Sequence, residues 1–284
     1  MQHGGPWALY ERRLRRVTAY IHDHLDEDLD MDRLAEIACL SPYHWHRIYR
    51  GVMGETPAAT VRRLRLQRAA LALTTGARAV ADIAAECGFP NVQSFSRTFR
   101  AAYGKPPLEY RRDGNHAALR TAIEEGDTAM YDVTIREQKP QDVIGLDHRG
   151  SYMTIGKSFD TLTGLMASRG LFGPENRIIA VYYDDPDSVA EEDLRSTACF
   201  TTVRADIAVE PPLRRFTVAG GRYAVLLHRG PYSDLHLAYA WLYRQWLPQS
   251  NLAVRNEPPL EIYLNTPQDT APTDLLTEIC IPVE

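Results

Sequence analysis

Two stretches of the sequence place arginine beside other hydrogen-bonding side chains at the spacing of an exposed helix face. If the aromatic residues of each stretch are buried, the outer face of the first carries Tyr43, His46, Arg47 and Arg50, and the outer face of the second carries Val92, Gln93, Ser96, Arg97 and Arg100. Arginine can pair with guanine, glutamine with adenine, and tyrosine or valine can touch a thymine methyl group. Both faces therefore predict sequence reading in the major groove of DNA, with Arg50 and Arg100 better placed for phosphates.

The two stretches belong to an internal repeat. Residues 34–50 and 83–100 share one layout of short helix, tight turn and second helix, and Ser41 and Asn91 are candidate N-caps of the second helices. Between the copies, residues 57–74 form an uninterrupted helical pattern that bears Arg62, Arg63, Arg65 and Arg68. Such a helix would hold the two base-reading helices on one face of the domain, in successive major grooves about 34 Å apart. The alternative is a set of ordinary helices with solvated arginine faces, which the repetition disfavours.

These segments carry a family resemblance. Residues 31–112, through LAEIACLSPYHWHRIYR and GFPNVQSFSRTFRAAYGKPPLEYRR, resemble the DNA-binding domain of the AraC family of bacterial transcription regulators. The resemblance implies base reading by the second helix of each unit, and hence by Tyr43, His46 and Arg47, then by Val92, Gln93, Ser96 and Arg97. Cys39 stands where the family usually has glycine, so we expect the left-handed backbone there to be strained or avoided. Gly88 keeps the expected residue in the second copy.

The C-terminal half also repeats. HRGSY at 148–152 matches HRGPY at 228–232, and VYYDDP at 181–186 matches IYLNTP at 262–267, at an offset of 80 or 81 residues. Each copy has the pattern strand, helix, strand, strand. The fold class predicted for the chain is therefore multidomain: an all-α double helix-turn-helix domain, then an α+β domain of two βαββ repeats, with an antiparallel sheet covered by helices on one face.

A carboxylate in the last repeat is a candidate ligand contact. Strand alternation in residues 260–264 would send the aliphatic side chains to the helix-covered face, and Glu261 and Tyr263 to the other. The first copy offers Tyr182 but has Ala180 in place of the glutamate. An ionised glutamate among aromatic rings favours an organic cation, through charge pairing and cation–π contact. Glu278 could add a second charge, and the alternative is a glutamate on a solvated strand. Tyr152, Tyr232 and Trp241 are further candidate ligand contacts. A core or rim position is equally plausible for each of them and for Trp246.

The C-terminal segment, residues 132–284, resembles the GyrI-like effector-binding domain through HRGPY, PPLEIYLNTP and TEICIPV. In multidrug-sensing members of that family, a glutamate of the matching strand lies in the ligand cleft, which implies this role for Glu261. Some stand-alone members resemble hydrolases that use the glutamate and a tyrosine. The enzyme alternative has Glu261 as a general base, helped by Tyr263 or Tyr152.

Composition and charge fit this division. The chain has 284 residues, of which 44% are hydrophobic and 24% charged, enough for about two globular domains. Up to Asp113 there are 17 Lys and Arg against 13 Asp and Glu, and afterwards 15 against 24, so a basic segment precedes an acidic one. We predict a DNA-binding domain over 1–113, a linker over 114–131 and an effector-binding domain over 132–284.

Other features concern compartment and cofactors. The four cysteines are scattered, which suggests neither a disulfide framework nor a zinc cluster, and no metal or cofactor is expected. No apolar run reaches the roughly 20 residues that a membrane span needs, and no secretory signal is evident, so we expect a cytoplasmic protein. The leading hypothesis is a transcription regulator that binds double-stranded DNA and a small hydrophobic or cationic effector, which either alters DNA binding or recruits RNA polymerase. A protein-docking role for the C-terminal half is the third alternative.

Overall fold

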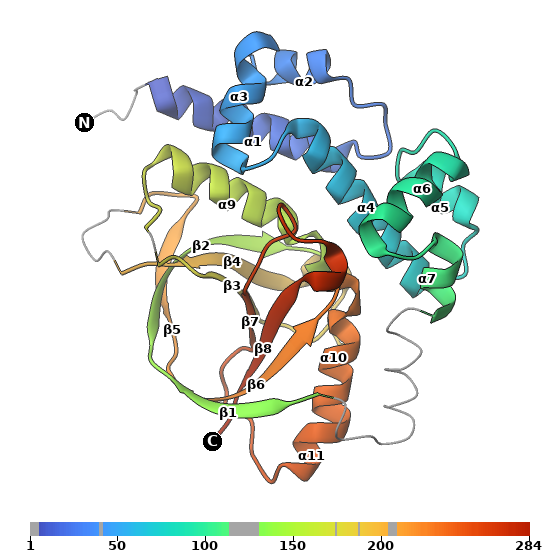
Figure 1. Ribbon diagram of the computed structural model, residues 1–284. Helices are drawn as coiled ribbons and strands as arrows, with labels where there is room; N and C mark the ends of the chain where they lie inside the picture. Colours follow the sequence, from blue (N-terminus) through green and yellow to red (C-terminus); the bar gives the residue numbers. More distant parts are fainter. Residues whose placement is uncertain (1–5, 40–41, 114–130, 174, 187, 204–208) are drawn as a thin grey trace. The chain divides into compact units, whose positions relative to one another are not determined.

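The computed structural model describes residues 6–39, 42–113, 131–173, 175–186, 188–203 and 209–284, drawn in colour in Figure 1. Within these ranges, the side chains of residues 6–11, 42–44, 46 and 113 are not described. The chain divides into two compact units, Met1–Leu108 with Phe159–Phe172, and Glu109–Ser158 with Gly173–Glu284. The predicted linker, 114–131, lies outside the described residues except for Tyr131.

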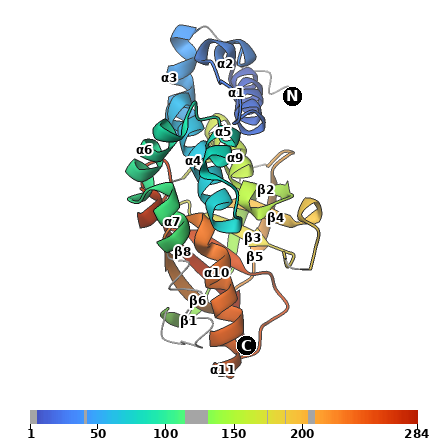
Figure 2. The same ribbon diagram turned by 90° about the vertical axis from the view of Figure 1, so that its right-hand side faces the viewer.

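The first unit is helical. Its helices are α1 (Pro6–Asp23), α2 (Met31–Ile37), α3 (Pro42–Met53), α4 (Pro57–Thr75), α5 (Val80–Glu86), α6 (Val92–Tyr103) and most of α9 (Gly156–Ser168), while α7 (Pro107–Asp113) spans the boundary to the second unit. The pairs α2–α3 and α5–α6 are the two predicted helix-turn-helix units. The helix α4 runs from one pair to the other (Figures 1 and 2), as the spacer pattern predicts.

Local signals in the sequence fix where the helices begin. The side chain of Asn91 accepts a hydrogen bond from the backbone N–H of Ser94 at 2.8 Å, which confirms it as the cap of α6, and Thr56 caps α4 in the same way. The predicted cap Ser41 lies outside the described residues. Both turns are left-handed, with φ of 69° at Gly88 and 50° at Cys39. Of the two alternatives expected for Cys39, strain or avoidance, the structure excludes avoidance: the tight turn imposes the left-handed conformation on a residue that has a Cβ atom.

The cores of the two helix-turn-helix units are aromatic. Trp45 and Tyr49 are completely buried in the first and meet edge to face, with ring centroids 5.5 Å apart. Phe95 and Phe99 are completely buried in the second, and Phe99 stacks on Tyr103. Large rings at a spacing of four residues therefore face inward, which turns the arginine-bearing faces of α3 and α6 outward.

The second unit is an eight-stranded antiparallel sheet that is visibly curled (Figure 1). Its strands are β1 (Val133–Gln138), β2 (Gln141–Arg149), β3 (Ile178–Tyr182), β4 (Arg195–Thr201), β5 (Arg214–Val218), β6 (Gly221–Arg229), β7 (Leu260–Tyr263) and β8 (Leu276–Pro282), in the order β1-β6-β8-β7-β3-β4-β2-β5. The predicted fold class is confirmed. Each repeat also has one strand more than the pattern indicated, and the extra strand pairs with the other repeat: β1 with β6, and β5 with β2.

The sheet buries apolar side chains on both faces. On one face, Leu226 and Ile279 pack against α10 (Leu235–Trp241), which continues as a π-helical turn (Leu242–Trp246) and α11 (Leu247–Gln249). On the other face, Ile262 and Cys280 belong to a second apolar cluster. Glu261 is opposite Ile279 in the pairing of β7 and β8, and therefore shares the face that α10 covers. The prediction that the aliphatic residues of β7 face the helix, and Glu261 the other side, is wrong.

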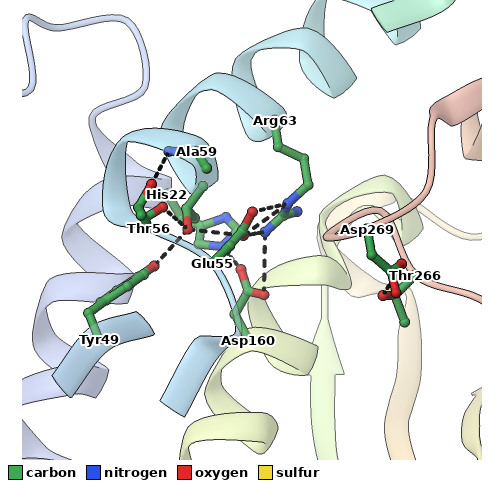
Figure 3. Close-up of polar contacts among 10 residues, drawn as sticks. His22, Tyr49, Glu55, Thr56, Ala59, Arg63, Asp160, Thr266 and Asp269 are labelled. Carbon is green, nitrogen blue, oxygen red and sulfur yellow. Dashed lines mark hydrogen bonds and ion pairs between the residues drawn. The ribbon is translucent and has the colours of Figure 1, made fainter. Parts of the chain in front are cut away.

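A buried ionic network lies within the first unit (Figure 3). The guanidinium of Arg63 on α4 is 2.6 Å from the Glu55 carboxylate and 3.8 Å from that of Asp160 on α9, and Asp160 is 2.9 Å from Nε2 of His22 on α1. Thr60 adds a hydroxyl hydrogen bond to Glu55. Burial alone lowers the pKa of Arg63, but the two carboxylates outweigh it and raise the pKa overall, so the guanidinium stays charged.

Arg63→Leu is expected to destabilise the protein, because it leaves the Glu55 and Asp160 carboxylates buried without their guanidinium. Breaking a buried ion pair on one side costs about 3–5 kcal/mol. The matched control is Arg62→Leu, the exposed neighbour on the same helix, which should change stability by less than about 0.5 kcal/mol. Urea unfolding of the full chain, followed by circular dichroism, measures both, and equal shifts would contradict the assignment.

Among the described residues, no helix is long and apolar enough to cross a membrane.

Candidate functional site

The outer face of α6 carries the side chains that the sequence predicts for base reading. Gln93, Arg97 and Arg100 are exposed, and Val92 and Ser96 are partly exposed. Ser96, Arg97 and Arg100 also line an open groove together with Ala101, Gly104 and Pro106. The structure therefore brings the five predicted residues of this helix together on one surface.

The outer face of α3 is described in part. Arg47 and Arg50 are exposed on it, one turn apart, while the side chains of Tyr43 and His46 lie outside the described residues. The arginines of the spacer helix α4 are of two kinds. Arg62 and Arg68 are exposed, whereas Arg65 donates to the backbone oxygen of Leu25 at 2.8 Å. With Arg63 in the buried ionic network, half of the arginines on α4 hold the helical unit together instead of facing outward.

The carboxylate of Glu261 lies beneath two tyrosine hydroxyls. Its Oε2 atom accepts hydrogen bonds from Tyr263 at 2.7 Å and from Tyr182 at 3.0 Å, and the two hydroxyl oxygens are 3.0 Å from each other. Glu261 is 3% exposed, so the carboxylate has almost no contact with water. The three residues come from adjacent strands: Tyr182 from β3, and the other two from β7.

The hydrogens in this triangle can be counted. Three oxygen atoms lie within 3.0 Å of one another, but the two phenols supply only two hydrogens. With Glu261 ionised, both phenols donate to it, and the contact between the two tyrosines has no hydrogen. With Glu261 protonated, the third hydrogen completes the triangle. The hydrogen bonds of the triangle are therefore better satisfied when the carboxyl group is neutral.

Burial also favours the neutral form of the Glu261 carboxyl group. It raises the pKa of Glu261 above the ordinary value, and the hydroxyls of Tyr263, Tyr182 and Tyr239 lower the pKa only in part. Moving a carboxylate out of water costs several kcal/mol. Hydrogen bonds to a charged group contribute about 1.5–3 kcal/mol each, so the phenols offset this cost only in part. A positive charge entering the site would tip the balance towards the ionised form.

The site lies on the pseudo-twofold axis of the two repeats. Glu261 is paired across the sheet with Ala180, its own equivalent in the first repeat. Tyr182 and Tyr263 are likewise equivalent, and each meets a further tyrosine edge to face: Tyr152 at 4.7 Å and Tyr232 at 5.4 Å between ring centroids. The aromatic surroundings are thus symmetric, and the single carboxylate is what breaks the symmetry.

The remaining predicted ligand residues have different surroundings. The Tyr152 hydroxyl donates to the backbone oxygen of Asp184 at 2.7 Å, so only its ring faces the site. Trp241 is completely buried in the apolar cluster between α10 and the sheet. Glu278 lies on the opposite face from Glu261 and pairs with Arg136 at 2.5 Å, so the prediction that it adds a second charge is wrong.

Sequence reasoning missed Tyr239. This residue comes from α10, its hydroxyl is buried, and it is close enough to Glu261 for the carboxylate to raise the pKa of the phenol in addition to burial. The repeat offered a signal, since the equivalent in the first copy is Phe159, the same ring without a hydroxyl. A hydroxyl that only one copy carries, like the glutamate, points to the asymmetric site.

Taken together, two outward-facing arginine helices and a buried carboxylate on a duplicated sheet define a DNA-binding regulator with a small-molecule domain. A family model described as a helix-turn-helix domain matches residues 34–113, and one described as a GyrI-like small molecule binding domain matches residues 131–284. The chain belongs to the GyrI-like family and carries an AraC-type DNA-binding domain.

Curated proteins are similar either to nearly the whole chain or to about a third of it. The right origin-binding protein of Escherichia coli is 24% identical over 95% of this chain and 97% of its own length. Transcriptional regulator Rob of Salmonella typhimurium is 33% identical over 37% of each chain, and regulatory protein SoxS of Escherichia coli is 32% identical over 36% of this chain and 95% of its own. The chain is thus a DNA-binding transcription regulator with a small-molecule-binding domain.

Two solved structures resemble the separate parts. The C-terminal domain of EcmrR is 19% identical, with a TM-score of 0.45, over 55% of this chain and 98% of its own. The DNA-binding domain of AdpA, solved in complex with a target DNA, is 30% identical, with a TM-score of 0.35, over 38% of this chain and 94% of its own.

Glu261→Gln is expected to stabilise the ligand-free protein at neutral and alkaline pH. Because folding raises the pKa of Glu261, the folded state holds the proton more tightly, and stability falls as pH rises above the unfolded pKa of about 4.3. The glutamine variant lacks this loss, so it should be the more stable protein at about pH 8, and the difference should vanish near about pH 4.

Unfolding midpoints measured across this pH range provide the test. The control is Glu137→Gln, an exposed glutamate on β1, which should follow the wild type. A wild type that is more stable than Glu261→Gln at pH 8 would contradict the assignment.

Proposed function

We propose that the Glu261 site binds an organic monocation with aromatic or apolar groups, and that this effector alters DNA binding by the helical unit. The observation that carries the proposal is the single carboxylate, 3% exposed, between Tyr182 and Tyr263. Among the described residues, no Lys, Arg or His lies within ion-pair distance of it. The site thus holds one ionisable acid among aromatic rings, and a bound cation would favour its charged form.

Magnitudes favour a cation over a neutral ligand. Two unit charges 4 Å apart attract by about 4 kcal/mol at the effective dielectric constant of protein sites. A cation over an aromatic ring gains roughly 0.5–2 kcal/mol more. A neutral ligand of the same shape obtains neither contribution, and an anion is repelled. One carboxylate further implies an effector with one positive charge.

Tetraphenylphosphonium and its anionic isostere tetraphenylborate test this charge preference. We expect tetraphenylphosphonium to bind wild-type protein, and Glu261→Gln to weaken that binding by about tenfold or more, which corresponds to at least about 1.4 kcal/mol. Glu278→Gln is the matched control on the opposite face of the sheet and should leave the affinity unchanged. Isothermal titration calorimetry provides the affinities. Equal binding of the two isosteres, or no loss in Glu261→Gln, would reject the cation site.

The enzyme alternative differs in the fate of the ligand. A general base must reach a water molecule or a substrate proton, whereas both phenols of the triangle point at the Glu261 oxygen. We therefore favour binding over hydrolysis. Benzoylcholine, a cationic ester, separates the two: stoichiometric binding with full recovery of the ester supports an effector site, and turnover that Glu261→Gln abolishes supports a hydrolase.

For the helical unit, we propose that α3 and α6 read an asymmetric promoter site in successive major grooves. The exposed arginines on both helices, each above an aromatic core, support this assignment. RNA polymerase is a further proposed partner, and the cytoplasm the proposed compartment.

Arg97→Ala should weaken DNA binding and relax base preference, whereas Arg50→Ala should weaken binding to all sequences similarly and reduce the salt slope by about one. The reason is that, in the proposed binding mode, Arg97 of α6 faces base edges. Arg50 of α3, one turn after Arg47, faces phosphates. Salt titrations on a cognate and a scrambled duplex compare the two variants. Identical effects of both variants on the two duplexes would contradict the assignment.

A further inference from the structure

A buried chain of hydrogen bonds connects α7 to the turn that precedes α10. The hydroxyl of Tyr110 is 3.1 Å from Oγ of Ser233, and Oγ of Ser233 is 2.9 Å from Oδ1 of Asp234. The three residues are 5%, 4% and 1% exposed. A polar chain at this depth is sensitive to small displacements, because losing one bond leaves buried groups without their partners.

The direction of donation follows from counting hydrogens. Ser233 has a single hydroxyl hydrogen, and it points to the Asp234 carboxylate, so Tyr110 must donate to Ser233. Burial raises the pKa of Tyr110 above the ordinary value, and the charge of Asp234 raises it further, so the phenol keeps its proton. Tyr110 is thus a permanent donor at the end of the chain.

Both sides of the predicted linker converge on this cluster. Tyr110 precedes residues 114–130 and Tyr131 follows them. Burial and the nearby charge of Asp234 raise the pKa of Tyr131, whose ring meets Trp241 of α10 edge to face at 5.2 Å. Two residues that flank the predicted linker on either side therefore lie near one carboxylate, within the second unit.

The same turn reaches the effector site. Tyr232, directly before Ser233, meets the ring of Tyr263 edge to face at 5.4 Å, and Tyr263 donates to Glu261 at 2.7 Å. Any change in how Glu261 holds Tyr263 therefore acts on a ring that is one peptide bond from Ser233.

The chain is a property of the second repeat alone. At the offset of 80 residues, Ser233 and Asp234 correspond to Met153 and Thr154, which are exposed. The turn does not need a buried Ser-Asp pair in order to form, since the first repeat makes the same turn without one. The pair thus has a role other than shaping the turn.

We infer that the Tyr110–Ser233–Asp234 chain couples the Glu261 site to the second helix-turn-helix unit, through α7, and so carries the effector signal to DNA. This inference rests on the proposed effector site. Without the effector, Tyr263 donates to Glu261 and its ring contacts Tyr232. The adjacent Ser233 accepts a hydrogen bond from Tyr110 of α7. When a cation pairs with Glu261, Tyr263 and Tyr232 reorient, and the hydrogen bond between Tyr110 and Ser233 changes.

A double-mutant cycle on DNA affinity tests the coupling without any ligand. Glu261→Gln changes the group to which Tyr263 donates, and Tyr110→Phe removes the hydrogen bond to Ser233. DNA dissociation constants are measured for wild type, both single variants and the double variant, on a duplex that the wild type selects from a random library. We expect Glu261→Gln to change the constant by about fivefold in the wild-type background, and by less than about twofold beside Tyr110→Phe.

Two further variants sharpen the cycle. Ser233→Ala removes the middle link and should reproduce the effect of Tyr110→Phe, which guards against an unstable variant. Tyr103→Phe is the matched control, a tyrosine of α6 whose hydroxyl is 3.5 Å from the backbone oxygen of Leu66, and it should combine additively with Glu261→Gln.

The outcomes separate the two proposals. Additive effects of Glu261→Gln and Tyr110→Phe overturn the coupling, even where tetraphenylphosphonium binds at Glu261. Failure of tetraphenylphosphonium to bind rejects the effector site instead, whatever the cycle gives. A non-additive cycle that Ser233→Ala reproduces and Tyr103→Phe does not establishes the coupling.

Discussion

A carboxylate that is barely stable in its own site organises the C-terminal domain. Glu261 is almost completely buried, and the phenol hydrogen bonds offset the cost of removing its charge from water only in part. The protonation of such a group responds strongly to a nearby charge. Stability is thereby exchanged for sensitivity, which is the property that the proposed cation site requires.

Duplication explains how such a group can be placed. Two similar repeats meet at β3 and β7, so that the equivalent residues Tyr182 and Tyr263 approach each other across the pseudo-twofold axis. The pair Ala180 and Glu261 differs between the repeats and places a single acid beside these tyrosines. The second repeat has diverged further at Tyr239 and at the Ser233–Asp234 pair, and these changes also lie around the site or beside it.

Sequence patterns predicted the helices better than the strands. Aromatic residues four apart in α3 and α6 identify the buried side of a helix unambiguously, so the exposed arginines were assigned correctly. In β7, alternation identified two faces but not which of them the helix covers, because the sheet has an apolar cluster on each side. The strands β1 and β5 were missed because their side chains are mostly polar or only partly buried. The roles of Arg63 and Tyr239 depend on partners far away in the sequence, which no local pattern reveals.

The exchange of β1 and β5 has a consequence for the edges of each repeat. Since each repeat completes its sheet with a strand from the other, a single repeat on its own would present unsatisfied backbone groups along its edges. Two identical copies would satisfy each other in the same arrangement. The duplicated arrangement therefore removes open edges that either repeat would expose alone, and because both copies lie in one chain, their residues can differ, as Ala180 and Glu261 do.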